Sequence, residues 1–419
     1  MQRRDNPYTP GAGRKPPYLA GRDRDLEEFS SLIEILASGG PDRSRIFYGL
    51  RGVGKTVLLM ELDLLASEAG WATTDVQEVG SQPDFRSTFA QMAARLLREM
   101  SRRHRIRDRV ERALGVVKAF SVVAPGGVQL KLDVDAVAGV ADSGDPEQDL
   151  VELLREIGQT AASAQSGALF LIDEMHNLDA ASLAAVCMAF QAVSRDALPV
   201  ALAAAGLPDL QVRLMRAKPY ADRLFEYREL GRLRDPEARV ALVKPASLLG
   251  VEFAADAAAE VVRLAAGYPY FLQEYGRELW NAAESSPITT ADVDEVRDLV
   301  QEQLARTFYG TRFEMASDAE QRYLAAMASL GAPPYSTAEV ARAWGAENQR
   351  QTSPHRDSLI QKGLIWSPRR GQVDFTVPLF AEFLLDHHPI AGFDDDWPPE
   401  AHRPEPRLEG GVDPSPPPS

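Results

Sequence analysis

The chain has 419 residues and a formal net charge of −15, with an apolar content that is ordinary for a globular protein. This length suits two or three domains, and the acidic balance argues against nucleic-acid binding over the whole surface without excluding one basic face. No window of about 18 apolar residues is free of charges, and no apolar signal core opens the chain, so we expect a cytoplasmic protein without membrane contact. The one cysteine, Cys187, lies in an apolar run and is expected to be a small buried side chain.

The first 16 residues are basic and rich in Pro and Gly, which predicts a flexible arm. Residues 17–24 then lead into a helix expected from Asp25 onward. Leu19 and Arg22 stand in this short segment, where the backbone is able to lie against a purine ring. An ordinary helix start is the alternative interpretation.

A complete GxxxxGK[ST] pattern follows at residues 49–56, between an apolar run at 46–48 and a helix-forming run at 57–62. Its glycines let successive backbone amides point inward around a polyphosphate at a helix N-terminus. Lys55 is expected to reach the β and γ phosphates, and the Thr56 hydroxyl to complete a Mg²⁺ site. The residues expected to contact the nucleotide here are Gly49, Arg51, Gly52, Val53, Gly54, Lys55, Thr56 and Val57. The sequence therefore predicts a site for ATP or ADP with Mg²⁺.

The next segments predict a strand at 71–76 and a helix at 85–100, followed by the most basic stretch of the chain at 101–109. Ala119–Val122, a turn at 125–127 and alternating apolar residues at 128–134 then predict a β-hairpin. We interpret residues 101–145 as an insertion on the nucleotide-binding domain. The basic stretch suits contact with nucleic-acid phosphates or a solvated helix face, and the second is the more common.

After a helix predicted at 149–164, four large apolar residues end in Asp173 and Glu174. This pattern is typical of a buried parallel strand whose C-terminal edge meets a ligand. We expect Asp173 to serve the Mg²⁺ site, and Glu174 to orient or deprotonate the water that attacks the γ phosphate. These acids follow a good phosphate loop at a suitable distance, which strengthens both assignments.

A further strand is predicted at 199–205, and its last residues, Ala204 and Ala205, cannot hold a water as a polar side chain there would. Arg213, Arg216 and Arg223 follow before a strand at 224–227. Each suits the stabilisation of transition-state charge in its own or a neighbouring subunit, with surface or salt-bridging roles as the alternative. Arg223 is the first choice because it directly precedes the strand.

From residue 235 the pattern is helical, and helices at 236–249, 254–266, 269–284 and 289–308 predict a lid over residues 235–315. Pro269 stands at a first helical position, where its fixed φ is favourable. Together with Tyr268 it is placed to pack on an adenine ring.

Residues 316–388 follow the order of a winged helix-turn-helix, with three helices and a hairpin. The side chains expected to face a DNA groove are Asn348, Gln349, Arg350, Gln351, Thr352, Ser353, His355 and Arg356, with Arg369 and Arg370 on the wing. Nearby acids offset these arginines, so a protein contact or autoinhibition is an equal alternative to DNA binding. Residues 389–419 are acidic and Pro-rich, which predicts a disordered tail.

From about Pro17 to Gln303 the chain resembles the AAA+ ATPases of the origin-recognition-like and signal-transduction (STAND) branch, often labelled AAA ATPase domain. The resemblance rests on residues 20–23, 49–56, 171–174, 206–208 and 267–269, and the C-terminal unit is similar to the winged helices that both groups append. It implies an α/β P-loop NTPase fold, a three-layer parallel sheet in a domain of residues 17–234, with the helical lid and the winged helix-turn-helix domain after it. In origin-recognition ATPases an arginine usually stands where this chain has Tyr270 and Phe271, so the resemblance leans to the STAND side and implies slow hydrolysis.

We therefore expect an ATP-dependent switch that couples nucleotide state to the winged helix, through a protein partner or nucleotide-dependent self-association. Two alternatives stay open. One is a DNA-binding replication or transcription factor whose ATPase tunes loading, with DNA contacts from Arg350, Arg356, Arg369 and Arg370. The other is a protein scaffold with a degenerate ATPase.

Overall fold

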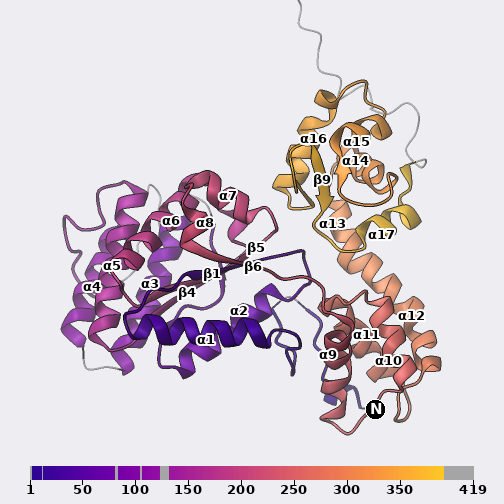
Figure 1. Ribbon diagram of the computed structural model, residues 1–419, viewed down its shortest axis with the longest axis horizontal. Coiled ribbons are helices and arrows are strands. Elements are labelled where there is room, and N and C mark those ends of the chain that lie inside the picture. The colour runs from indigo at the N-terminus through magenta and orange to yellow at the C-terminus, as the bar shows by residue number, and fades with distance from the viewer. Residues whose placement is uncertain (1, 12, 81–83, 104–105, 123–131, 391–419) are drawn as a thin grey trace, which may run out of the picture.

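The computed structural model describes residues 2–11, 13–80, 84–103, 106–122 and 132–390. These residues form a sheet domain, a group of lid helices beside it and a small unit at the far end of the lid (Figure 1). The predicted tail at 389–419 lies outside the described residues from residue 391 onward. Among the described residues, no helix combines the length and the apolar character that crossing a bilayer requires.

The sheet domain is built on six parallel strands in the order β2-β4-β5-β1-β6, with β3 also paired to β4. The strands are β1 (Ser44–Tyr48), β2 (Ala72–Thr73), β3 (Gln77–Glu78), β4 (Ala168–Asp173), β5 (Val200–Gly206) and β6 (Phe225–Glu229). The helices are α1 (Asp23–Ala37), α2 (Lys55–Glu68), α3 (Asp84–Arg103), α4 (Arg107–Val122), α5 (Pro146–Ser163), α6 (Ala180–Arg195), α7 (Leu210–Ala217) and α8 (Ala221–Leu224). Of the strand predicted at 71–76 only β2 forms, and β3 begins after it.

Strand β4 explains why the sheet has helices on both faces. Successive strand side chains point to opposite faces, so Phe170 and Ile172 join a core with α3 to α6, while Leu169 and Leu171 join a core with α1 and α2. Figure 1 shows these two helical layers enclosing the sheet. Cys187 lies in the first of these cores and is buried, as predicted.

The hairpin predicted after residue 118 is wrong for its first strand, because Ala119–Val122 is the last turn of α4. Val110, Ala113, Val117 and Phe120 are buried at helical spacing, and α4 packs on α3 and α5. Two-residue alternation in a short apolar run does not distinguish a strand from a buried helix end. The predicted turn at 125–127 and the second strand up to residue 131 lie outside the described residues, and residues 132–134 form no strand.

The arm expected to be flexible is instead docked on the lid over residues 2–11. Tyr8 is 3% exposed, and its hydroxyl donates to Leu242 O. The Asn6 amide donates to Arg277 O at 3.0 Å, and the Trp280 indole donates to Gln2 O at 3.1 Å. The lid leaves room for the ring only because residue 276 is glycine, where an added Cβ would overlap Tyr8. Burial of the Tyr8 ring stabilises the docked arm, although the composition of the arm is typical of disorder.

The lid consists of α9 (Asp235–Ser247), α10 (Ala255–Leu264), α11 (Pro269–Ala282) and α12 (Thr290–Leu304). The chain then continues as a connector, which consists of a π-helical segment, Ala305–Gly310, and the short helix α13 (Thr311–Glu314). Residues 230–234 are the irregular segment that joins β6 to the lid.

The C-terminal unit has the elements of a winged helix. They are α14 (Asp318–Ala328), α15 (Thr337–Trp344), α16 (Gln349–Gln361) and α17 (Phe380–His387), with an antiparallel sheet of order β7-β9-β8 made by β7 (Tyr335–Ser336), β8 (Ile365–Trp366) and β9 (Gln372–Phe375). The predicted fold class, an α/β P-loop fold with a helical lid and a C-terminal winged helix-turn-helix, is confirmed.

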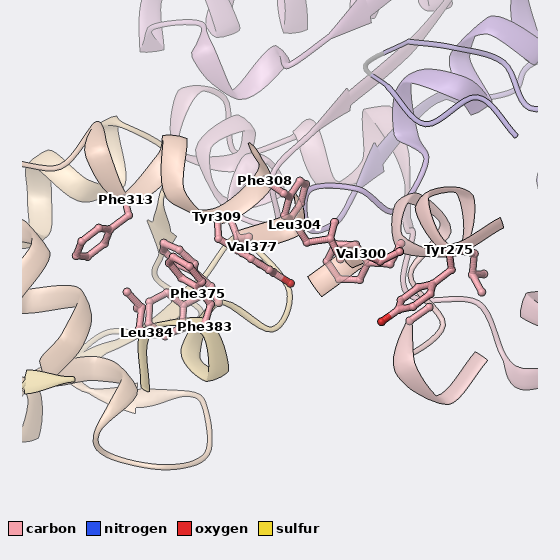
Figure 2. Packing of buried hydrophobic residues seen from close by; sticks show 14 of the residues in the cluster. Tyr275, Val300, Leu304, Phe308, Tyr309, Phe313, Phe375, Val377, Phe383 and Leu384 are labelled. Carbon is pink, nitrogen blue, oxygen red and sulfur yellow. The ribbon is translucent and has the colours of Figure 1, made fainter. Parts of the chain in front are cut away.

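The lid, the connector and the winged helix share one hydrophobic core. Figure 2 shows this core running from Tyr275 and Val300 in the lid, through Phe308 of the connector, to Phe383 and Leu384 in the winged helix. The predicted boundary between the lid and the winged helix, at residues 315–316, therefore does not separate two hydrophobic cores. A core that crosses both units favours their movement as one body.

Candidate nucleotide-binding site

The loop between β1 and α2 has the shape that its glycine pattern predicts. Gly52 has φ +79° and Gly54 has φ +92°, values that side chains other than glycine rarely adopt. At Gly49 an added Cβ would overlap Leu230 O. The loop therefore places backbone amides at the N-terminus of α2, where a phosphate binds favourably.

Lys55 is buried beside this loop, and its ammonium donates to Gly49 O at 3.0 Å and to Leu50 O at 2.9 Å. Burial lowers the pKa of Lys55 to about 8, against the opposing effect of Glu174 and Asp173. A buried ammonium group whose partners are neutral carbonyls is stabilised further when an anionic ligand binds beside it.

Asp173 ends β4, and its Oδ2 accepts a hydrogen bond from the Thr56 hydroxyl at 2.5 Å. Mg²⁺ is usually held by one or two such oxygens, together with waters and the phosphates of a substrate. Among the described residues no cluster of three or more His, Cys, Asp or Glu forms an all-protein metal site. The pair Thr56 and Asp173 therefore fits Mg²⁺ that arrives with a nucleotide.

Glu174 follows with a left-handed backbone, φ 47°, which turns its side chain toward the loop. Its carboxylate lies 3.8 Å from Arg51 Nη1 and 3.2 Å from His176 Nε2. Burial raises the pKa of Glu174, and Arg51 and Lys55 oppose this shift. A buried carboxylate at the end of a central strand is suited to general-base chemistry.

His176 is a neighbour of this carboxylate that the sequence analysis did not single out. Burial and the nearby cations lower the pKa of His176 to about 3, so the ring is neutral at pH 7. Leu207 N donates to its Nδ1 at 3.3 Å, which assigns the proton to Nε2, on the side of Glu174. The sequence signal, a polar residue two positions after the acidic pair, is too common to identify this role.

A cavity of about 360 Å³ lies above the loop, between the sheet domain, the arm and the lid. Of the predicted residues, those that line it are Leu19, Arg22, Arg51, Gly52, Val53, Gly54, Lys55, Thr56, Val57, Glu174 and Pro269. Gly49 and Asp173 stand just behind this lining, through Lys55 and Thr56. The cavity thus brings together residues that are far apart in the sequence.

Arg22 links two parts of the cavity wall. Its Nη2 donates to Val53 O in the phosphate loop and to Gly231 O in the segment before the lid, each at 3.1 Å. The same side chain therefore fixes the loop against the base of the lid.

The cavity wall also contains residues that the sequence analysis missed. They include residues of the arm (Thr9, Pro10, Gly11, Gly13, Arg14 and Pro16), of the lid (Gln273) and of the connector (Thr307, Phe308 and Arg312). No motif marks them, because their place depends on how the arm and the connector fold back. Tyr270, which the sequence analysis named at the place of an arginine in related lids, lines the cavity as well.

None of the three arginines proposed for the transition state lines the cavity of its own chain. Arg213 donates to His176 O and, at 2.8 Å, to Leu178 O, so it braces the turn after Glu174. Arg216 is exposed, and Arg223 is exposed beside Asp222. Arg223 therefore stays a candidate only for the nucleotide of a neighbouring copy.

Two family models match the chain. One, described as "AAA ATPase domain", matches residues 18–202, and the other, a domain of unknown function (DUF8462), matches residues 306–384. Residues 18–202 contain the phosphate loop and the acidic pair described above. This part of the chain belongs to the AAA+ P-loop ATPases. The family implies that the cavity binds a nucleotide.

Solved structures similar to most of the chain include Orc1 of Aeropyrum pernix in complex with DNA, at 17% identity and a TM-score of 0.42, over 90% of this chain and 95% of Orc1. The RuvB Holliday junction branch migration motor of Thermotoga maritima has 16% identity and a TM-score of 0.41, over 84% and 92%. A Walker-type ATPase of Pyrococcus abyssi has 12% identity and a TM-score of 0.47, over 88% and 96%. Comparison with curated protein sequences gives no match.

The brace formed by Arg213 leads to a prediction about Glu174. In Arg213→Ala the turn after Glu174 is no longer held at two carbonyls, so we expect ATP turnover to fall about tenfold or more while ATP affinity stays within about twofold. Steady-state turnover and equilibrium titration measure the two effects. Val212→Ala, at an exposed position of the same helix, is the control and should change neither. An Arg213→Ala protein that turns over ATP at the wild-type rate would contradict the assignment.

Proposed function

We propose that the protein is an ATP-hydrolysing regulatory switch in which nucleotide state controls the docking of the winged helix on the phosphate loop. One observation carries this proposal. The backbone N–H of Arg51, inside the phosphate loop, donates to Thr376 O of the winged helix at 3.0 Å.

The docked part of the winged helix is closely fitted to the loop. At Gly363 an added Cβ would lie 3.0 Å from Arg51 Nη2 and 3.5 Å from Leu207 Cδ1. The Thr376 hydroxyl donates to Gly363 O at 2.6 Å, which holds the two contact points together. Arg51 thus lies between the winged helix and Glu174, and a phosphate that rearranges Arg51 also disturbs the docking contact.

The same residues support hydrolysis. Lys55 is placed to bind the β and γ phosphates, and Glu174 to take a proton from the attacking water. When bound through Thr56 and Asp173, Mg²⁺ neutralises charge on the phosphates. The tip of β5 offers only buried Ala204 and Ala205, and no candidate arginine of this strand region lies in the cavity, which favours slow turnover.

Two substitutions separate nucleotide binding from hydrolysis. Lys55→Ala removes the ammonium group that faces the phosphates, so ATP affinity should fall about 100-fold. Glu174→Gln keeps the shape but removes the base, so ATP affinity should persist while turnover falls about 100-fold or more. Mg²⁺-dependent phosphate release and isothermal titration measure these outcomes. Unchanged turnover in Glu174→Gln would reject the role of Glu174, and absence of any Mg²⁺-dependent hydrolysis in the wild type would favour a scaffold.

Docking is measurable through labels on introduced cysteines. Burial raises the pKa of Cys187 to about 12, so labels should react with exposed positions such as Asp222→Cys and Arg370→Cys instead. We expect the distance between these labels to differ between ADP and a non-hydrolysable ATP analogue. A pair at Asp222→Cys and Gln191→Cys, both in the sheet domain, is the control and should show one distance. Equal distances for the first pair in both nucleotides would refute the switch.

A second candidate is nucleic-acid contact through the winged helix, which three exposed arginines favour. Arg350, Arg369 and Arg370 are exposed and have no carboxylate partner within the described part of the chain. Other members of the predicted groove-facing set are engaged within the unit. Thr352 is buried, His355 stacks on Trp344, the Gln349 amide bonds the Thr337 hydroxyl, and Arg356 pairs with Asp357 at 2.7 Å.

Replacing Arg350, Arg369 and Arg370 with alanine tests this candidate. Removing each arginine that binds a DNA phosphate should lower the slope of log affinity for duplex DNA against log salt concentration by about one. Arg356→Ala is the matched control, because its guanidinium already has a partner in Asp357. A wild-type protein without salt-dependent DNA affinity would exclude this candidate.

A further inference from the structure

The connector brings a cation into the nucleotide cavity from outside both the sheet domain and the lid. Helix α12 does not end at Leu304 but widens into the π-helical segment Ala305–Gly310 before α13. Short π-helical turns in α-helices often occur at functional sites. Here the wider turn places Thr307, Phe308 and Arg312 on the cavity wall.

The Arg312 side chain is held in place by its own segment. Its guanidinium lies over the Phe308 ring, with Cζ 4.4 Å from the ring centroid, and it donates to Phe308 O. Phe308 in turn stacks on Tyr270 of the lid, with centroids 4.9 Å apart, and Tyr270 N donates to Gly52 O in the phosphate loop at 3.3 Å. The guanidinium is therefore oriented before any ligand arrives.

Arg312 has no carboxylate within ion-pair distance among the described residues. Burial lowers its pKa, and Arg51 acts in the same direction, while Glu174 lies close enough to oppose both. A half-buried cation with carbonyl contacts alone, facing a cavity that already holds Lys55 and Arg51, is stabilised by an anion between them. Arg312 of the connector thus joins Lys55 and Arg51 of the phosphate loop among the cations that line the cavity.

We infer that Arg312 binds the terminal phosphate of ATP and so makes the position of the winged helix depend on that phosphate. The assignment rests on the proposed nucleotide switch and adds a second connection to it, besides Arg51. A guanidinium forms charge-assisted hydrogen bonds with phosphate oxygens, and its planar fork gives these bonds direction. Because ADP lacks the terminal phosphate, it leaves this side chain without its ligand.

The connector carries the effect of Arg312 into the winged helix. Tyr309, next to Phe308, stacks on Phe380 and Phe383 of α17, with centroids 6.0 Å and 5.1 Å apart. Phe313, next to Arg312, stacks on His388 at 4.0 Å. Figure 2 shows Phe308, Tyr309 and Phe383 in this packed core. A movement of the guanidinium toward a phosphate therefore also acts on the connector that packs against α17.

The test compares two nucleotides in two variants of the full chain. In Arg312→Ala, affinity for a non-hydrolysable ATP analogue with Mg²⁺ should fall about tenfold or more, while ADP affinity stays within about twofold. Arg312→Lys, which keeps the charge, should recover part of the difference. Arg306→Ala is the matched control, because Arg306 is exposed on the same connector and does not line the cavity. Isothermal titration gives the affinities, and thermal unfolding shows that each variant is folded.

A solely structural role for Arg312 predicts a different result, namely equal losses of ATP and ADP affinity together with a lower melting temperature. That result, or an unchanged affinity for the ATP analogue in Arg312→Ala, would overturn the assignment. If the wild type binds the ATP analogue through Lys55 while Arg312→Ala binds it equally well, only this inference fails. If the wild type binds neither nucleotide, the proposed function fails with it. In labelled Arg312→Ala, the nucleotide-dependent distance change should be lost.

Discussion

The hydrogen bond from Arg51 N to Thr376 O joins the two ends of the fold at the point where phosphate is expected. It links the loop that begins the nucleotide site to the residue after the last strand of the winged helix, and Gly363 of the same unit lies close to the Arg51 side chain. In the proposed switch, a change of loop shape would act on this contact.

The charge balance in the cavity depends on which groups its cations contact. Lys55 is held by two loop carbonyls, Arg312 by one carbonyl and an aromatic ring, and Arg51 approaches Glu174 at 3.8 Å. Each of these arrangements stabilises a charge less well than direct contact with an anion does. Arg51 and Lys55 also oppose the rise that burial causes in the pKa of Glu174. One set of charges thus serves both ligand binding and the carboxylate beside it.

Movement of the winged helix is connected to movement of the lid by packing. The core that contains Tyr275, Phe308, Tyr309 and Phe383 continues through the connector without interruption, whereas the sheet domain has two separate cores of its own. Between these bodies lie the irregular segment 230–234 and the polar contacts of Arg22 and Arg51. A few polar contacts and a short linker rearrange at a lower free-energy cost than a packed core does. The structure therefore favours a hinge between the sheet domain and the rest.

The sequence alone determined the phosphate loop, the strand that ends in Asp173 and Glu174, and the order of lid and winged helix, because glycine spacing and apolar periodicity are local properties of the chain. It led to the wrong structure for Ala119–Val122, where a short apolar run fits both a strand and a helix end. Only the tertiary structure decided that the arm docks through Tyr8, that Arg213 braces the turn after Glu174, and that Arg312 reaches the cavity. These contacts join segments far apart in the chain, and their free energy comes from burial and charge compensation that no local pattern records.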